Sequence, residues 1–177
     1  MKKVANIKAR TDNVKIRSIL KEIFDSDAEI TWNNSSTERL GYFSIADTKY
    51  QMKIQKDSEK IEGNDIYMFK FSWWDGREWQ KSFTKKQNAF SVFGVLRKGV
   101  LSFIKEVKPA IFFFVGDSKR HNVYSKLLDE LSRINAKEYG SIDGRDIAKE
   151  YVYILIRKDL TDTAVNKIKD YIKRTNE

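Results

Sequence analysis

The sequence contains no cysteine, one proline, one histidine and only eight glycines among its 177 residues. Without cysteine the chain has no disulfides, thiolate zinc sites, iron–sulfur clusters or cysteine nucleophiles, and this composition suits a reducing compartment. Such low proline and glycine contents leave no flexible linker, so we expect a single domain over residues 1–177. His121 has no neighbour in the sequence that supports a Ser-His-Asp triad, and one histidine cannot form a His-pair metal site.

Long apolar segments and nucleotide-binding motifs are also missing. The longest apolar run, AIFFFVG at residues 110–116, is far below the roughly 20 residues that span a bilayer. The basic N-terminal segment lacks the apolar stretch of a signal peptide. Neither G-x-G-x-x-G, a P-loop nor G-x-S-x-G occurs. We therefore expect a cytoplasmic protein that has no membrane association, no cofactor and no bound metal.

The chain has a formal net charge of +9, from 34 basic and 25 acidic residues. Residues 1–86 contribute +4 and residues 87–177 contribute +5, so no basic tail exists. A positive charge of this size favours anionic partners, nucleic acid first among them. A solvated lysine-rich surface is the alternative. The sequence leaves both open.

Apolar periodicity and turn residues predict the secondary structure. The predicted helices span residues 12–24, 88–107 and 118–135, and a final helix is capped by Thr161 or Asp162. The predicted strands span residues 3–9, 28–33, 39–46, 49–56, 65–74, 110–115 and 150–157. Residues 140–146, rich in Gly and Asp, are predicted to form a loop.

The alternation of apolar and polar residues in the strands at 49–56 and 65–74 indicates the sheet type. Gln51, Lys53 and Lys70 alternate with large apolar residues, as in antiparallel strands with one solvated face. We therefore predict an α+β fold: a mixed, largely antiparallel sheet with helices packed mainly on one face, in the order β-α-(β)-β-β-β-α-β-α-β-α. The helix between the strands near 110 and 150 allows a parallel pair.

The segment FSWWDGREWQKSF holds three of the four tryptophans. Alternation places Trp73 inward, which leaves Trp74 and Trp79 to be explained. Tryptophan next to Arg77 and Lys86 is a combination that stacks bases and holds phosphates, and it is also typical of a protein interface. The alternative is that the tryptophans cover the core and a sheet edge. We take Trp74, Trp79, Arg77 and Lys86 as candidate contact residues.

A second candidate site is the start of the helix predicted at 118–135. Asp117 or Ser118 can cap it, and Lys119 and Arg120 then occupy a first turn where the helix dipole favours acids. Cationic side chains beside free N–H groups form an anion site, with Tyr124 one turn beyond Arg120. The alternative is a tolerated surface, offset by an acid such as Asp143 or Asp146.

Carboxylate-metal nucleases use an acidic residue with a D/E-x-K tripeptide. The sequence has three such tripeptides, Asp47-Thr48-Lys49, Glu106-Val107-Lys108 and Asp117-Ser118-Lys119. With 25 acidic residues and 24 lysines in 177 positions, about three arise by chance. The motif therefore carries no signal above its background.

Three segments, IYMFKFSWW, FTKKQNAFSVFGVLRKGVLSFIKEVKP and AIFFFVGDSKRHNVYSKLL, resemble a group of uncharacterised proteins encoded by tailed bacteriophages and prophages. The group shares a pattern of apolar residues around N/D-A-F-x-V-F, a helix ending in K-P, an apolar strand and S-R-x-x-x-Y. The matching residues are Phe83, Thr84, Asn88, Ala89, Phe90, Val92, Phe93, Val95, Pro109, Arg120 and Tyr124. The resemblance covers about half the chain and implies a phage or prophage origin. It implies no activity.

These observations favour a small non-enzymatic phage-type accessory protein in the host cytoplasm. We expect it to bind nucleic acid, or a host protein that handles nucleic acid, as an inhibitor of a host defence. One alternative is a virion structural or assembly protein whose aromatic residues mediate self-association into a homo-oligomer. The other is a carboxylate-metal nuclease that uses Asp47 and Lys49 with Glu38.

Overall fold

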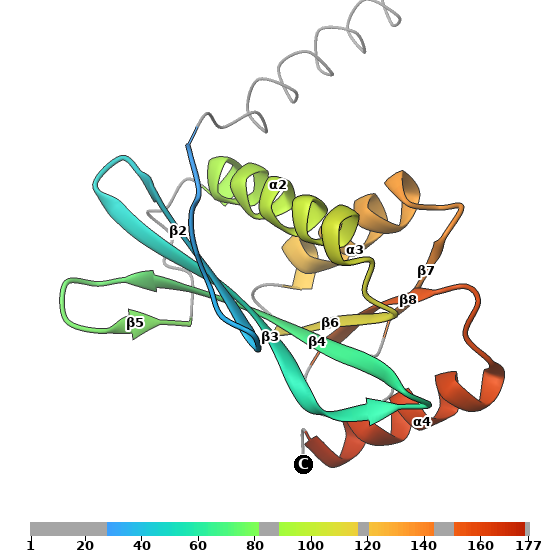
Figure 1. Cartoon of the computed structure of the whole chain (residues 1–177). Coiled ribbons are helices and arrows are strands. Elements are labelled where there is room, and N and C mark those ends of the chain that lie inside the picture. Colours follow the sequence, from blue (N-terminus) through green and yellow to red (C-terminus); the bar gives the residue numbers. More distant parts are fainter. Residues whose placement is uncertain (1–27, 82–88, 117–120, 144–150, 176–177) are drawn as a thin grey trace, which may run out of the picture.

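One mixed sheet of eight strands runs through the protein (Figure 1). The computed structural model describes residues 28–81, 89–116, 121–143 and 151–175. The strands are β1 (Thr31–Asn34), β2 (Glu38–Ile45), β3 (Thr48–Ile61), β4 (Asn64–Trp74), β5 (Trp79–Gln80), β6 (Ile111–Gly116), β7 (Tyr139–Asp143) and β8 (Tyr151–Arg157). The helices are α2 (Ala89–Val107), α3 (His121–Ile134) and α4 (Asp162–Thr175).

The strand order is β1-β2-β3-β4-β6-β8-β7, and β5 pairs with the end of β4. Among the strands of the described residues, only β4 and β6 pair in parallel, and α2 lies between them in the chain. The α+β class and the largely antiparallel sheet are thus confirmed, and most element boundaries lie close to those predicted. The strand predicted at 3–9 and the helix predicted at 12–24 lie outside the described residues.

One prediction about the second half of the sheet was wrong. Residues 140–143, predicted to begin a loop, lie in the edge strand β7. The helix between the strands near 110 and 150 allowed a parallel pair, but these strands, β6 and β8, are antiparallel. Both observations have one cause. The chain passes from β6 through α3 to β7 at the edge, and β8 then returns between them.

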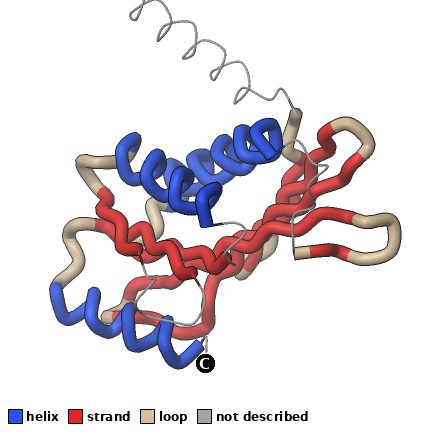
Figure 2. The backbone as a smooth tube through the Cα atoms, turned by 180° about the vertical axis from the view of Figure 1, so that it is seen from behind, coloured by secondary structure: helices blue, strands red, loops and turns tan. Residues whose placement is uncertain are grey.

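The helices lie on both faces of the sheet (Figure 2). Helices α2 and α3 pack on one face over side chains such as Phe69, Phe112 and Tyr153. Helix α4 packs on the other face over Ile111 and Ile154. The expectation that helices pack mainly on one face is not confirmed, because α4 lies on the face opposite α2 and α3. Strands β6 and β8 are apolar on both faces, so both of their faces need a cover.

Strands β3 and β4 have only one buried face over much of their length. Tyr50, Met52 and Ile54 are buried in the α2 layer, whereas Gln51 and the other alternate residues point to the opposite face. Among the described elements only α4 reaches that opposite face, at the far end of β3. The predicted solvated face is confirmed. We call this surface of β2, β3, β4 and β5 the open face.

Gly41 in β2 lies in a tightly packed part of the sheet beneath α2. It is paired with Met52 of β3. A Cβ atom on Gly41 would lie 2.8 Å from Met52 Cγ, 2.9 Å from Ile30 Cγ2 and 2.9 Å from Trp32 Cζ3. Separations this short require a neighbour to move, and the fully buried Met52 has little freedom to do so.

We expect Gly41→Ala to lower the free energy of unfolding by about 1–3 kcal/mol, the usual cost of overpacking. Gly140→Ala in β7 is the matched control, because nothing lies within 4 Å of a Cβ placed there. Urea denaturation of both variants provides the measurement. Equal midpoints for the two variants would show that Gly41 is not needed for packing.

Helix α4 is tied to β3 by polar contacts at its edge. Its first turn is capped by Thr161, whose Oγ1 accepts the backbone N–H of Ala164 at 3.1 Å, in agreement with the predicted cap. Near its end, the Tyr171 hydroxyl donates to Asp57 Oδ2 at 2.6 Å. Burial alone would raise the pKa of Asp57, but the bonds from Tyr171 and from the backbone of Glu59 outweigh it and lower the pKa.

Tyr171→Phe should destabilise the protein by about 1.5 kcal/mol at neutral pH, the lower end for hydrogen bonds to charged groups. Because folding lowers the pKa of Asp57, its stabilisation is full above the usual aspartate pKa of about 4 and disappears as pH falls through the folded value. The loss in Tyr171→Phe should therefore shrink on acidification.

Tyr139→Phe is the control for this pH dependence. The Tyr139 hydroxyl is also buried, but it donates to the uncharged carbonyl of Pro109 at 2.9 Å. Its loss should cost about 1 kcal/mol with no change between neutral and acidic pH. Urea midpoints across that range test both variants, and parallel pH profiles would refute the role given to Asp57.

Candidate functional site

Two lysines lie directly opposite each other in the middle of the open face. Lys53 of β3 and Lys70 of β4 are register partners, and like charges in such positions are destabilising. Lys53 forms an ion pair with Glu38 of β2. For the exposed Lys70, no ion pair is found within the described part of the chain. Among the described residues, the charge of this cationic pair is compensated in part by one acid, Glu38.

A row of polar side chains crosses the same face two residues along the strands from the lysine pair. Ser72 Oγ donates to Gln51 Oε1 at 3.4 Å, and Gln51 Nε2 donates to the Tyr42 hydroxyl oxygen at 3.0 Å. The three side chains come from β4, β3 and β2 respectively. They lie close enough to bond because Ser72 is the register partner of Gln51, and Gln51 is the register partner of Tyr42. Their amide and hydroxyl groups line the face beside the lysine pair.

Aromatic side chains form the end of the open face near β5. The rings of Trp74 and Trp79 meet edge to face with centroids 5.5 Å apart, and the Trp79 ring lies 6.1 Å from Tyr42. Trp79 remains 37% exposed, which is unusual for so large an apolar side chain. We call Tyr42, Trp74 and Trp79 the aromatic cluster.

The turn between β4 and β5 holds Trp79 in place through Asp75. Its Oδ1 accepts the backbone N–H groups of Glu78 at 2.9 Å and Arg77 at 2.8 Å. Its Oδ2 accepts Gln80 Nε2 at 2.8 Å. These bonds, the one from Glu78 first, lower the pKa of Asp75. The chain turns at Asp75-Gly76, and Gly76 takes the positive φ of 100° that the turn requires.

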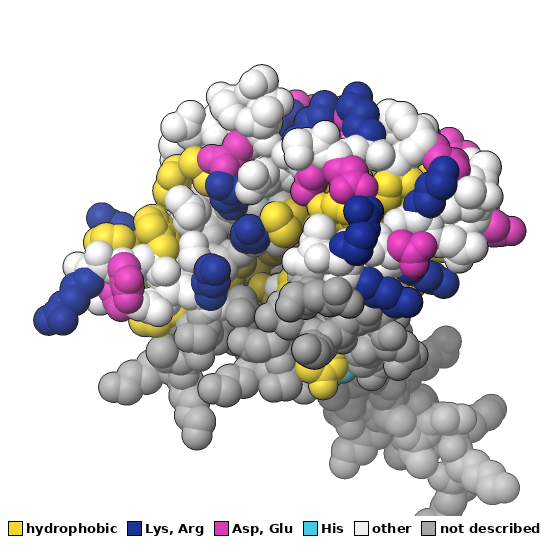
Figure 3. All heavy atoms as spheres, turned by 90° about the horizontal axis from the view of Figure 1, so that it is seen from below, with side chains coloured by type: hydrophobic (Ala, Val, Ile, Leu, Met, Phe, Trp, Pro, Cys, Tyr) yellow, Lys and Arg dark blue, Asp and Glu magenta, His cyan; other side chains and the backbone are white. Residues whose placement is uncertain are grey.

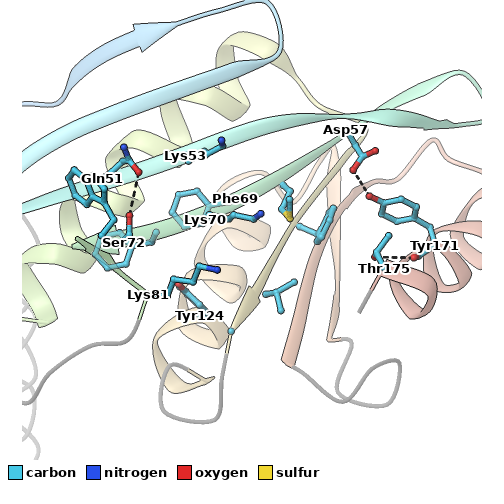
Figure 4. A pocket seen from close by; sticks show the side chains of 16 residues that line it. Gln51, Lys53, Asp57, Phe69, Lys70, Ser72, Lys81, Tyr124, Tyr171 and Thr175 are labelled. Carbon is cyan, nitrogen blue, oxygen red and sulfur yellow. Dashed lines mark hydrogen bonds between the residues drawn. The ribbon is translucent and has the colours of Figure 1, made fainter. Parts of the chain in front are cut away.

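A hollow of about 670 Å³ lies on the open face between the aromatic cluster and α4. Its floor includes Met68, Phe113 and Val115, and three lysines, Lys53, Lys70 and Lys81, lie around it. Figure 3 shows lysine and arginine side chains on this side of the molecule around a depression where apolar atoms are visible. In Figure 4 the three lysines extend toward one space, and the Asp57–Tyr171 pair lies at its far end.

The structure brings some of the predicted contact residues together. Trp74 and Trp79 share the open face, and Arg77 is exposed in the turn between them. Trp73 points to the other face and packs against the α2 core, as alternation predicted. Lys86, Lys119 and Arg120 lie outside the described residues.

Tyr124 does not fit the role of a contact residue. Its side chain is only 2% exposed and packs against Phe114 and Tyr153, with centroids 5.1 Å and 5.8 Å away. Its spacing from Arg120 placed it on the same helix face as the proposed anion site, but that face of α3 turns toward the sheet. Tyr124 therefore belongs to the core and the inner wall of the hollow.

His121, at the start of α3, is engaged in packing contacts. Its Nδ1 lies 2.7 Å from the Tyr153 hydroxyl, and its ring lies 4.7 Å from that of Tyr151. These contacts join α3 to β8. These packing contacts give His121 a structural role.

The residues of the nuclease alternative are not assembled. Glu38 begins β2, whereas Asp47 lies in the turn after its end, so the roughly 23 Å length of the extended strand separates them. In the second tripeptide, Glu106 is held by both terminal nitrogens of Arg39 at 2.7 Å, which lowers the pKa of Glu106. No cluster of three possible metal ligands occurs among the described residues. The geometry does not support this alternative.

Sequence reasoning missed Lys53, Lys70 and Lys81 as members of one site. Alternation did place Lys53 and Lys70 on the polar sides of their strands. It could not show that they are register partners, because register depends on the pairing of β3 with β4. The sequence also did not show that α4 forms a wall of the hollow, because the face of the sheet on which α4 packs depends on the order of all the strands.

Comparisons with models of protein families, with curated proteins and with solved structures identify no match to this chain. Within the described ranges, no helix has both the length and the apolarity needed to cross a membrane. The site therefore has to be interpreted from its own geometry and charge.

Proposed function

We propose that this protein binds nucleic acid through the open face of its sheet. The observation that carries the proposal is the Lys53–Lys70 pair, two cations held side by side on the same face as an aromatic cluster in which Trp79 is exposed. Adjacent like charges raise the free energy of the folded protein, and an anion between them lowers it. A local cost of this kind with no full internal compensation is typical of a functional surface.

The chemistry around the pair supports a phosphate-containing polymer. Lys81 adds a third cation at the same hollow. Amide and hydroxyl groups of Gln51 and Ser72 offer further hydrogen bonds to phosphate or sugar. The net charge of +9 favours association with polyanions in general. Lysines next to apolar and aromatic surface are suited to a ligand with both charged and aromatic parts.

The wider setting is proposed on the sequence alone. We infer that the protein is a non-enzymatic accessory factor of phage or prophage origin that acts in the host cytoplasm. A nucleic-acid surface is compatible with interference in a host defence that acts on nucleic acid. If the aromatic cluster instead mediates self-association, as in the virion alternative, sedimentation will show concentration-dependent oligomers and no oligonucleotide will bind.

Binding of labelled DNA and RNA oligonucleotides, measured by fluorescence anisotropy over about 50–300 mM salt, tests the proposal. We expect affinity to fall steeply with salt because bound lysines displace counterions. Lys70→Gln should weaken binding at every salt concentration and reduce the slope of log K against log salt by about 0.7–0.9, the value of one phosphate contact.

Lys105→Gln provides the matched control. Lys105 is an exposed lysine in the last turn of α2, the helix on the opposite face of the sheet. The two substitutions change the net charge equally, so they separate a specific contact from the overall field. Equal effects of the two, or weak binding that does not respond to salt, would refute the proposed interface.

A further inference from the structure

We infer that the open face selects single-stranded over double-stranded nucleic acid. The inference rests on the proposed function and adds the class of ligand. Its basis is the juxtaposition of the aromatic cluster with the lysine pair on one surface, the open face. The sequence alone could not establish this, because it did not show that Trp79 remains exposed or that Lys53 and Lys70 are neighbours.

The aromatic cluster needs a partner with a free ring face. Trp74 and Tyr42 contact Trp79 at tilts of 61° and 51°, so neither is stacked flat on the exposed Trp79 ring. An unpaired base can stack on such a ring. In a duplex, neighbouring base pairs cover both faces of each base, and presenting one requires extrusion at a cost of a few kcal/mol. Only a single strand gives Trp79 a partner without that cost.

The lysines alone would lead to the opposite preference. Duplex DNA carries one charge per about 1.7 Å of axis and releases more counterions per phosphate contact than a single strand does. A surface that uses only charge should therefore bind duplex at least as well. A preference for single strands identifies the aromatic contribution, and it cannot arise from the net charge of +9.

The hollow provides room for an unstacked nucleotide. Its volume of about 670 Å³ is in the range of small-molecule sites. Met68 and Val115 offer apolar surface to a base, while Lys70 and Lys81 are placed to meet a phosphate. Along β4, Trp74 of the aromatic cluster, Ser72 of the polar row and Lys70 of the lysine pair follow one another in steps of two residues. A single strand laid along this direction meets stacking and cationic groups in turn.

The test compares a single-stranded oligonucleotide of about 16 nucleotides, near the upper limit of common site sizes, with a blunt hairpin duplex of the same sequence. DNA and RNA versions are both measured at one fixed salt concentration. We expect the single strand of at least one sugar type to bind about tenfold or more tightly than its duplex. Tryptophan fluorescence should also be quenched by the single strand.

Two variants of Trp79 separate stacking from charge. Trp79→Ala should weaken single-strand binding by about 5- to 150-fold, the equivalent of one stacked base, and leave duplex binding within about twofold. Trp79→Phe keeps an aromatic ring and should retain most of the single-strand affinity. Because Trp79→Phe disturbs the β4–β5 turn less than Trp79→Ala, it is also the control for local unfolding. Circular dichroism and the urea midpoint of both variants show whether the fold is retained.

The outcomes distinguish this inference from the proposed function. Salt-dependent binding with duplex equal to or tighter than single strand overturns the single-strand preference and leaves the nucleic-acid interface in place. The same follows if Trp79→Ala weakens both ligands equally. Absence of salt-dependent binding to either ligand refutes the proposed function itself.

Discussion

The two halves of the sheet differ in how many of their faces are apolar, and this difference determines where the described helices α2, α3 and α4 pack. Strands β6 and β8 are buried on both faces, so they need α2 and α3 on one side and α4 on the other. Strands β2, β3 and β4 alternate, and burial by α2 satisfies their single apolar face. The result is a sheet with a step on one side, where α4 ends and the open face begins.

That step concentrates the unusual features of the molecule. The hollow forms there because α4 is a wall rather than a lid, and the Asp57–Tyr171 bond fixes its distance from β3. The lysine pair is tolerated because the opposite sides of β3 and β4 are fixed by the core, which sets the register regardless of surface charge. A turn held by the hydrogen bonds of Asp75 keeps Trp79 at the other end of the same surface.

Much of this architecture could be predicted from the pattern of residues. The alternation around Met52 and Phe69 indicated one solvated face, and the apolar runs at 110–116 and 151–156 indicated buried central strands. Strand β7 could not be predicted, because Gly140 and Asp143 suggest a loop and only pairing with β8 makes the segment a strand. For the site, Trp74 and Trp79 could be selected from composition. The opposed lysines and the burial of Tyr124 depend on register and helix packing, which no local pattern encodes.

Lysine footprinting with and without a bound oligonucleotide tests most directly that the open face is the binding surface. Acetylation followed by mass spectrometry reports each lysine separately. The account predicts that Lys53, Lys70 and Lys81 become protected, while Lys105 on α2 and Lys126 on α3 remain as reactive as in the free protein. Protection on α2 and α3 with unchanged reactivity at Lys53 and Lys70 would contradict it.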